Sequence, residues 1–256
     1  MVSLSIRGLT KTFGSVAAVD QATLDARAGE FLVIIGESGC GKTTLLKLIA
    51  GLETPDNGVI LIGGLPVNDV PVGRRNVQMI FQNFALWPHM KVFDERAYTN
   101  LTLALKVRRW SREKISTFLR PLASKVGIEE KFFERKPSEL SGGQQQRVAL
   151  GRAMATSPQI MLMDEPLSNF DPPARLKMRQ EILTFHREHQ LTTLFVTHNL
   201  ADGLAMADRI AVMHDGKFDQ VDTAVNLMRD PANRYVADFF EAERLSPRAG
   251  ISQRHR

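Results

Sequence analysis

Residues 36–43 read Gly36-Glu37-Ser38-Gly39-Cys40-Gly41-Lys42-Thr43 and fit the pattern G-x-x-x-x-G-K-[ST] in full. The run before them, Phe31–Ile35, is continuously apolar, which predicts a strand covered on both faces. The segment after them, Lys42–Leu52, has apolar residues at helical spacing. A strand, a glycine-rich turn and a helix in this order predict a phosphate-binding loop, in which backbone N–H groups and the positive end of the helix dipole surround phosphate oxygens. We expect Lys42 to reach the β- and γ-phosphates of a nucleotide and Thr43 to hold Mg²⁺ through its hydroxyl.

The rest of the chain alternates between strand and helix patterns on both sides of a helical stretch. Strands are predicted at 3–9, 22–27, 59–62, 77–81, 160–163, 193–197 and 209–213, with a hairpin at Asp215-Gly216 leading into 217–221. Helices are predicted at 93–107, 112–126, 143–155, 174–189 and 199–206, with Ser111 capping the second of them. This order indicates an α/β fold whose parallel-sheet core carries a helical subdomain.

Composition and charge exclude several classes of protein. The 256 residues are 43% hydrophobic with a formal net charge of +5. The sequence shows no secretory signal and no run near the roughly 18 apolar residues of a membrane helix. A single cysteine, Cys40, excludes an internal disulfide and fits a reducing cytoplasm. The charge is too small to argue for nucleic acid, and part of it lies in a basic tail at 241–256, which we expect to be solvated; contact with an anionic surface is the alternative.

A second candidate site follows the apolar run Ile160–Met163, which ends in Asp164 and Glu165. At the end of a buried strand, Asp164 is expected to hold the Mg²⁺ shell, as in P-loop NTPases generally. Glu165 is then placed to polarise a water against the γ-phosphate. On its own this pattern is also typical of a strand that ends in exposed acids, but the phosphate-binding loop favours the catalytic interpretation.

Cys40 lies inside the phosphate-binding loop and has two interpretations. The favoured one is a small spacer residue. The alternative is a reactive thiol, because a helix N-terminus lowers the pKa of a cysteine. In that case an alkylating agent inactivates ATP hydrolysis and MgATP protects, whereas unchanged activity after complete labelling removes the idea.

The stretch at 140–147 reads LSGGQQQR and resembles, without a mismatch, the signature of ABC-type ATPases. Phe13 resembles the aromatic residue that stacks on adenine in that family, and Gln82 resembles the lid glutamine that senses Mg²⁺ and the γ-phosphate. Residues 168–171 (SNFD) resemble the loop that touches the partner subunit, and His198 resembles the switch histidine at the γ-phosphate. The resemblance covers about residues 3–240.

The resemblance implies a P-loop NTPase core with a mostly parallel sheet, an N-terminal antiparallel β subdomain and an inserted α-helical subdomain. The expected cassette spans 1–240, with the helical subdomain at about 86–155 inserted in the RecA-like core. Residues 241–256 are expected to form a short basic tail, with no regulatory domain.

The resemblance also implies the roles of individual residues. The catalytic residues are expected to be Glu165, His198, Gln82 and Lys42. The nucleotide-binding residues are expected to be Phe13, Gly36, Glu37, Ser38, Gly39, Cys40, Gly41, Lys42, Thr43, Thr44 and Gln82. The metal ligands are expected to be Thr43, Gln82 and Asp164. The signature residues Ser141, Gly142, Gly143 and Gln144 are expected to reach the ATP of the partner subunit; taken alone, Ser-Gly-Gly before a helix would be a plain N-cap.

The implied cofactors are ATP and Mg²⁺, and the implied assembly is a homodimer, or a paired cassette, around two ATP molecules. The segment 82–93 resembles the corresponding one in importers of sugars, polyamines or iron. Transmembrane permease subunits and a solute-binding protein are therefore expected partners, and nucleic acid is not. The expected location is cytoplasmic, on the inner face of the cell membrane, with basic residues around Lys106–Lys114 facing the membrane partner. An exporter-type ATPase, an ABC ATPase acting on DNA or ribosomes, and a non-hydrolysing module are the alternatives.

Besides the expected lack of a C-terminal regulatory domain, three departures from the family pattern stand out. About five extra residues lie between Asp94 and Asn100, next to the expected docking groove for the permease. Asn199-Leu200 follows His198 where the family has Asp-Gln. Pro172-Pro173 follows the partner loop, and Pro172 suits the first position of a helix.

Overall fold

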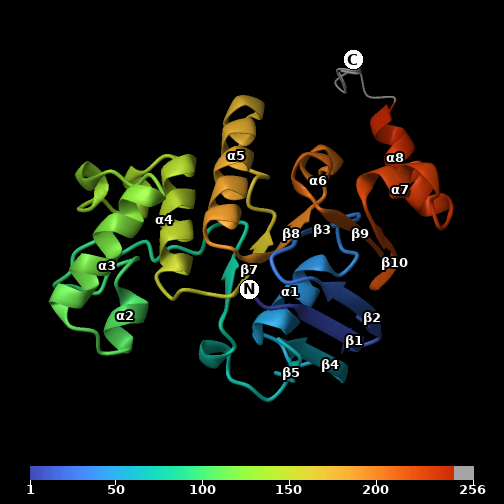
Figure 1. Ribbon diagram of the computed structural model, residues 1–256, viewed down its shortest axis with the longest axis horizontal. Coiled ribbons are helices and arrows are strands. Elements are labelled where there is room, and N and C mark those ends of the chain that lie inside the picture. Colours follow the sequence, from blue (N-terminus) through green and yellow to red (C-terminus); the bar gives the residue numbers. More distant parts are fainter. Residues whose placement is uncertain (245–256) are drawn as a thin grey trace.

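The computed structural model describes residues 1–244, which form two β-sheets with helices between and around them (Figure 1). The larger sheet has six strands in the order β10-β9-β3-β8-β7-β6. Its strands are parallel except β10, which pairs antiparallel with β9. The bounds are β3 (Phe31–Ile35), β6 (Val77–Ile80), β7 (Ile160–Asp164), β8 (Thr192–Thr197), β9 (Arg209–His214) and β10 (Lys217–Asp222).

The smaller sheet is antiparallel, with strands in the order β2-β1-β4-β5. Its strands are β1 (Leu4–Phe13), β2 (Val16–Ala26), β4 (Asn57–Ile62) and β5 (Leu65–Pro66). Helix α1 (Lys42–Ala50) lies between the two sheets, where its leucines pack in one buried cluster with residues of β1, β3 and β8. Because apolar side chains cover most of its surface, burial on both sides fixes α1 and the loop that precedes it.

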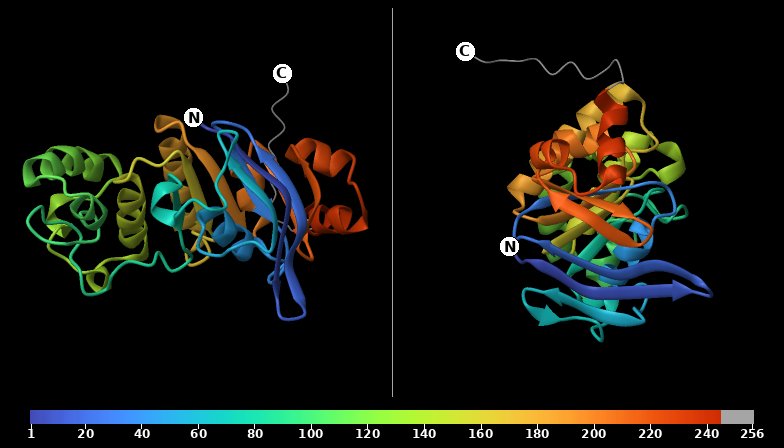
Figure 2. Two further views of the ribbon diagram at one scale, coloured as in Figure 1. Left: turned by 90° about the horizontal axis from the view of Figure 1, so that it is seen from below. Right: turned by 90° about the vertical axis from the view of Figure 1, so that its right-hand side faces the viewer.

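The remaining helices cover the other face of the large sheet and its two ends. α5 (Pro172–Glu188) and α6 (Leu200–Met206) pack on β3, β7 and β8 through a second buried cluster. α2 (Leu103–Val107), α3 (Arg112–Lys125) and α4 (Gly142–Met154) gather at one end of the molecule, and α7 (Ala224–Arg229) and α8 (Arg234–Arg244) at the other (Figures 1 and 2). Short 3-10 turns span Val72–Arg74, Glu130–Phe132 and Pro137–Glu139.

The register of the parallel strands decides where the site forms. Ile35 at the end of β3 pairs with Thr197 at the end of β8, and Asp164 at the end of β7 pairs with Val196. The three following loops therefore leave the same edge of the sheet. In open α/β sheets this carboxyl edge is where ligands bind.

Most of the predicted elements are confirmed, and the α/β fold with one antiparallel and one mostly parallel sheet is correct. Ser111 caps α3 by accepting a hydrogen bond from the N–H of Lys114 at 3.3 Å. Pro172 is the first residue of α5, and Asp171 caps that helix through the N–H of Ala174. Strands β1 and β2 are longer than predicted, and β5, α7 and α8 were not predicted.

The helix predicted over 93–107 is wrong for most of its length, since only α2 is helical there. The N–H of Phe93 donates to the carbonyl of Phe133 at 3.0 Å, so this N–H makes a long-range hydrogen bond and not a helical one. The Asn100 side chain accepts from the N–H of Trp87 at 2.9 Å and donates to the carbonyls of Trp87 and Met90, each at 3.1 Å. The extra residues noted in the sequence form the loop that these bonds close.

The basic tail expected at 241–256 meets the structure only in part. α8 extends to Arg244, so residues 241–244 of the expected tail are helical, and residues 245–256 lie outside the described residues. Across residues 1–244, no helix combines the length and the apolar character needed to cross a membrane.

A buried ion pair joins α5 to α6 and gives a stability prediction. Arg179 Nε donates to Asp202 Oδ1 at 2.6 Å, and the side chain of Asp202 is 2% exposed. Replacing Arg179 by methionine leaves a buried carboxylate without its partner, so we expect a loss of about 3–5 kcal/mol in the free energy of unfolding. Urea denaturation measures it. The control is Arg7→Met, which breaks an exposed pair with Asp25 and is expected to cost at most about 1 kcal/mol.

Candidate nucleotide-binding and hydrolysis site

The phosphate-binding loop joins β3 to α1, and glycine is required at two of its positions. A Cβ at Gly36 would lie 2.1 Å from the carbonyl oxygen of Met213, and one at Gly41 would lie 2.1 Å from that of Ala18. Gly41 also has a φ of +108°, which favours glycine. Gly41 is the N-cap of α1 and offers no side chain to its first N–H groups. The start of α1 therefore presents free donors, as a phosphate site requires.

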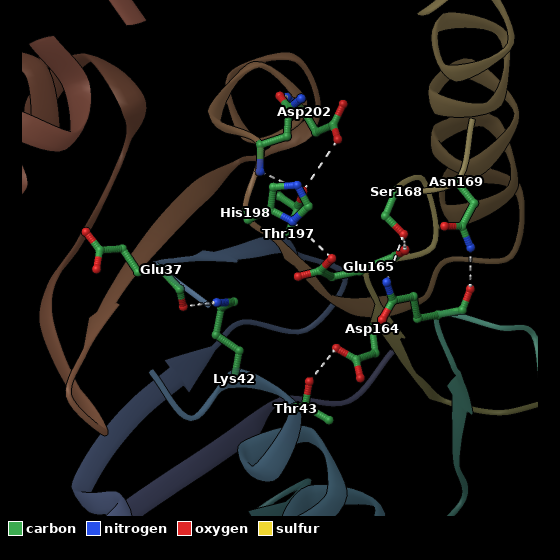
Figure 3. Close-up of polar contacts among 12 residues, drawn as sticks. Glu37, Lys42, Thr43, Asp164, Glu165, Ser168, Asn169, Thr197, His198 and Asp202 are labelled. Carbon is green, nitrogen blue, oxygen red and sulfur yellow. Dashed lines mark hydrogen bonds and ion pairs between the residues drawn. The ribbon is translucent and has the colours of Figure 1, made fainter. Parts of the chain in front are cut away.

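Lys42 is 5% exposed and folds back over the loop. Its ammonium group donates to the carbonyl of Glu37 at 2.7 Å (Figure 3). It also donates to the carbonyl of Gly36 at 2.8 Å, and its nitrogen lies 3.5 Å from the sulfur of Cys40. The loop thus holds a positive charge at its centre with hydrogen bonds to neutral carbonyls. Phosphate oxygens are stronger acceptors for such a group.

Cys40 is 7% exposed, and its sulfur would lie 2.8 Å from a Cβ at Gly36. The side chain fills space beneath the loop, between Gly36 and Lys42. This burial favours the interpretation of Cys40 as a small spacer.

Thr43 and Asp164 meet at the carboxyl edge of the sheet. The Thr43 hydroxyl donates to Asp164 Oδ1 at 3.0 Å (Figure 3). Burial raises the pKa of the Asp164 carboxyl, and the hydrogen bond from Thr43 opposes that rise. The predicted pair of metal ligands is therefore assembled across α1 and β7, with its charge in a desolvated position.

Glu165 and His198 form a second pair beside it. His198 Nδ1 lies 3.0 Å from Glu165 Oε2, and the Glu165 side chain is 19% exposed (Figure 3). Glu165 has a φ of +47°, and its N–H donates to the carbonyl of Val196 at 3.0 Å. A glutamate in this backbone conformation is uncommon and costs free energy, which is typical of functional positions. The turn aims the carboxylate away from β7 and towards the loop after β8.

The loop after Glu165 connects this pair to Gln82. The Ser168 hydroxyl donates to the carbonyl of Glu165 at 2.9 Å, and Gln82 Nε2 donates to that hydroxyl at 3.3 Å. Asn169 Nδ2 donates to the Gln82 carbonyl at 3.5 Å (Figure 3). The sequence predicted Gln82 and residues 168–171 as separate motifs, and nothing in their spacing signals these contacts.

The family model described as ABC transporter matches residues 19–168, more than half of the chain. The chain belongs to the ABC transporter family. It is an ABC ATPase subunit, as the signature at 140–147 predicted.

Relatives of this ABC cassette include transport ATP-binding proteins of several organisms. It is 45% identical over 254 residues to the osmoprotective compounds uptake ATP-binding protein GgtA of Synechocystis, covering 96% of this chain and 68% of the relative. It is 44% identical to the trehalose/maltose import ATP-binding protein MalK of Thermococcus litoralis (93% and 64% covered) and 43% identical to the spermidine/putrescine import ATP-binding protein PotA of Oleidesulfovibrio alaskensis (91% and 61%). The chain thus spans about two thirds of the length of these relatives.

Solved structures support the same assignment. The dimeric structure of MJ0796, described as a bacterial ABC transporter cassette, has a TM-score of 0.75 and 30% sequence identity, covering 86% of this chain and 98% of that one. A dimeric post-hydrolysis state of the same cassette, bound to ADP and Pi, has a TM-score of 0.74.

The signature residues of this cassette begin α4. Ser141 is the N-cap: its hydroxyl accepts from the N–H of Gln144 at 3.4 Å, and Gln144 Oε1 accepts from the N–H of Ser141 at 2.9 Å. Ser141 and Gly142 are exposed, and within residues 1–244 no hydrogen bond joins this group to the phosphate-binding loop. These residues therefore form the N-cap that the plain interpretation expects, and their contact with the ATP of a partner subunit stays a prediction.

The structure also places Phe13, the expected adenine-stacking residue, and Asn199, which departs from the family pattern. Phe13 ends β1 and is 49% exposed, with Lys11 Nζ 5.5 Å from its ring centre. Asn199, which replaces the expected aspartate, caps α6 by accepting from the N–H of Asp202 at 3.3 Å. His198 thus stands between β8 and a capped helix, and its main chain is held on both sides.

Proposed function

We propose that two copies of this cassette, or one copy and a paired cassette, close around two MgATP molecules and hydrolyse them. The observation that carries the proposal is the grouping of Lys42, Thr43–Asp164 and Glu165–His198 at one edge of the parallel sheet. Lys42 would leave the loop carbonyls for the β- and γ-phosphates. Phe13, exposed at the end of β1, would stack on adenine.

Glu165 is the proposed general base. Its carboxylate accepts a proton from the attacking water, whose oxygen then bonds to the γ-phosphorus while the bond to ADP breaks. His198 orients Glu165 through the 3.0 Å contact and would itself contact the γ-phosphate. The left-handed turn at Glu165 keeps the carboxylate in this position before the nucleotide arrives.

The oxygen donors of Thr43 and Asp164 fit Mg²⁺. Within residues 1–244, no group of three or more His, Cys, Asp or Glu side chains forms a metal cage. A hydroxyl and one carboxylate are instead suited to an ion that takes its other ligands from phosphates and water. Gln82, which bonds Ser168 in this structure, is the proposed third ligand. When bound, the ion would neutralise charge on the β- and γ-phosphates.

The glycines of the signature support the paired arrangement. A Cβ at Gly142 would meet only a side-chain carbon of Phe170 at 3.8 Å, and one at Gly143 would meet Met178 at 3.7 Å. These are ordinary contacts, so the packing of this chain does not require glycine at either position. A ligand that approaches the backbone from outside explains their small size, and the phosphate of a partner's ATP fits a helix N-terminus.

Gly142→Asp tests this arrangement. Aspartate suits the first turn of a helix, and its Cβ has room, so we expect the thermal midpoint of the variant to stay near that of the native chain. Its charge would face the γ-phosphate of the partner's ATP, so we expect ATP hydrolysis to fall at least about tenfold. Phosphate release and differential scanning calorimetry measure the two effects. Hydrolysis at the native rate would contradict a signature contact with ATP.

We further propose that the cassette drives separate permease subunits of a solute importer at the inner face of a membrane, with a solute-binding protein. Relatives named for trehalose/maltose, sn-glycerol-3-phosphate and spermidine/putrescine import support this. The segment 86–155, with α2–α4, is the proposed inserted subdomain within a cassette spanning 1–240. Purification of the tagged chain with its permease, followed by transport of trehalose, spermidine and sn-glycerol-3-phosphate in proteoliposomes, tests it. An importer moves one solute towards the cassette side, and movement away would indicate an exporter.

A further inference from the structure

Arg152 lies in the last turn of α4 and makes contacts that the hydrolysis site does not explain. Its guanidinium donates to the carbonyls of Ala85 and Phe84 at 2.6 and 2.7 Å. Burial alone lowers the pKa of Arg152, to about 10, and within the described residues no carboxylate forms an ion pair with it. A mostly buried charge is thus used to hold two neighbouring main-chain carbonyls.

The two residues that Arg152 holds have a rare backbone conformation. Phe84 has a φ of +59° and Ala85 a φ of +43°, and neither is glycine. Such a turn persists only where its surroundings hold it in place. The Phe84 ring is 5% exposed, and the N–H of Ala85 is bonded to the Asn83 side chain at 3.2 Å. The two hydrogen bonds from Arg152 tie the carbonyls of this turn to α4.

The 84–85 turn lies between Gln82 and Trp87. Gln82, two residues before the turn, donates a hydrogen bond to Ser168 of the catalytic loop. Trp87 follows the turn, and its ring lies 4.9 Å from the Arg152 guanidinium carbon. Asn100 binds both the N–H and the carbonyl of Trp87, which fixes the far side. A movement of Arg152 therefore changes the path of the backbone on which Gln82 is carried.

We infer that Arg152 is a positioning residue that transmits the position of α4 to Gln82. The other end of α4 carries Ser141 and its neighbours, which we propose to bind the partner's ATP; the inference rests on that proposed function. Because α4 is a continuous helix from Gly142 to Met154, its two ends move together. Closure of the signature on ATP then moves the 84–85 turn, and with it Gln82 relative to the catalytic loop.

The test uses Arg152→Gln and Arg152→Lys. Neither side chain can hold two carbonyls with a planar fork as arginine does. We expect kcat for ATP hydrolysis to fall at least tenfold in Arg152→Gln and less in Arg152→Lys, with KM for MgATP within twofold of the native value. Arg120→Gln is the matched control, since Arg120 is a half-exposed arginine paired with Glu95 and Glu130. We expect that control to keep native kinetics.

A rescue variant separates this role from a general loss of stability. Glycine adopts positive φ without the cost that alanine carries. Adding Ala85→Gly to Arg152→Gln should therefore raise kcat at least threefold above that of Arg152→Gln alone. Native kcat in Arg152→Gln, a matching loss in the Arg120→Gln control, a proportional rise in KM, or failure of Ala85→Gly to restore kcat would each overturn the inference.

A fluorescence measurement tells whether a negative result contradicts the role of Arg152 or the proposed ATP hydrolysis. The chain has two tryptophans, so Trp110→Phe leaves Trp87 as the single reporter. We expect Arg152→Gln in that background to shift the Trp87 emission without nucleotide and to abolish the further shift on adding MgATP. An inactive native chain that still shows these shifts would refute the hydrolysis proposal alone. Unchanged Trp87 emission would refute the role of Arg152.

Discussion

Glu165→Gln is expected to lower the rate of ATP hydrolysis by about 10²–10⁴-fold, the contribution of a positioned general base. Glutamine keeps the shape of the side chain and its contact with His198, but its amide cannot accept the proton of the attacking water. The left-handed backbone at this position and its bond to Val196 do not depend on the carboxylate. We therefore expect the variant to fold and to bind ATP with native affinity.

Phosphate release at saturating MgATP measures the loss, and titration with a fluorescent ATP analogue measures binding. Because the variant binds ATP without releasing it as ADP, we also expect it to accumulate as a dimer in gel filtration with MgATP. Glu188→Gln is the control, since Glu188 is an exposed glutamate at the end of α5. Native turnover in Glu165→Gln would assign the base to another group.

Lys42→Ala is expected to lower kcat/KM for ATP by about 10²–10³-fold, the cost of removing a charged donor from a developing negative charge. The loss has two sources. The phosphates lose a buried ammonium group, and the carbonyls of Gly36 and Glu37 lose the donor that holds the loop closed.

Steady-state hydrolysis and equilibrium dialysis with labelled ATP measure this effect. The control is Lys47→Ala on the same helix, which removes the same charge one turn further along α1. A Lys42→Ala variant that binds and hydrolyses ATP normally would mean that the phosphates lie elsewhere.

The phosphate-binding loop could be predicted from the sequence because its motif residues are consecutive and the leucines of α1 follow one helical pattern. The contacts that require glycine at 36 and 41 come from the distant carbonyls of Met213 and Ala18, so the motif shows the glycines but not these partners. Asp164 and Glu165 could be predicted for a related reason. The apolar run that they follow forms a central strand, and the end of a parallel strand lies at the ligand edge.

The loop within 93–107 and the contacts of Gln82 and Arg152 could not be predicted, because they depend on contacts between distant segments. The apolar spacing at 93–107 is typical of a helix, yet the N–H of Phe93 donates to the carbonyl of Phe133, and the side chain of Asn100 binds the backbone of Trp87 and Met90. No spacing rule couples position 100 to position 87. In the same way, the hydrogen bonds from Gln82 to Ser168 and from Arg152 to the 84–85 turn join residues 67 to 86 positions apart. Such pairs become visible only in three dimensions.

Some glycines of this chain are required by its own packing and others by the proposed partner's ATP, and this has a genetic consequence. A substitution at Gly36 or Gly41 would clash with the chain's own backbone, so we expect the altered subunit to fold poorly and to be degraded. A substitution at Gly142 or Gly143 causes no such clash within the altered subunit. In a cell that makes both forms, such a subunit would pair with intact ones and disable them. We expect signature alleles to be dominant and phosphate-loop glycine alleles to be recessive.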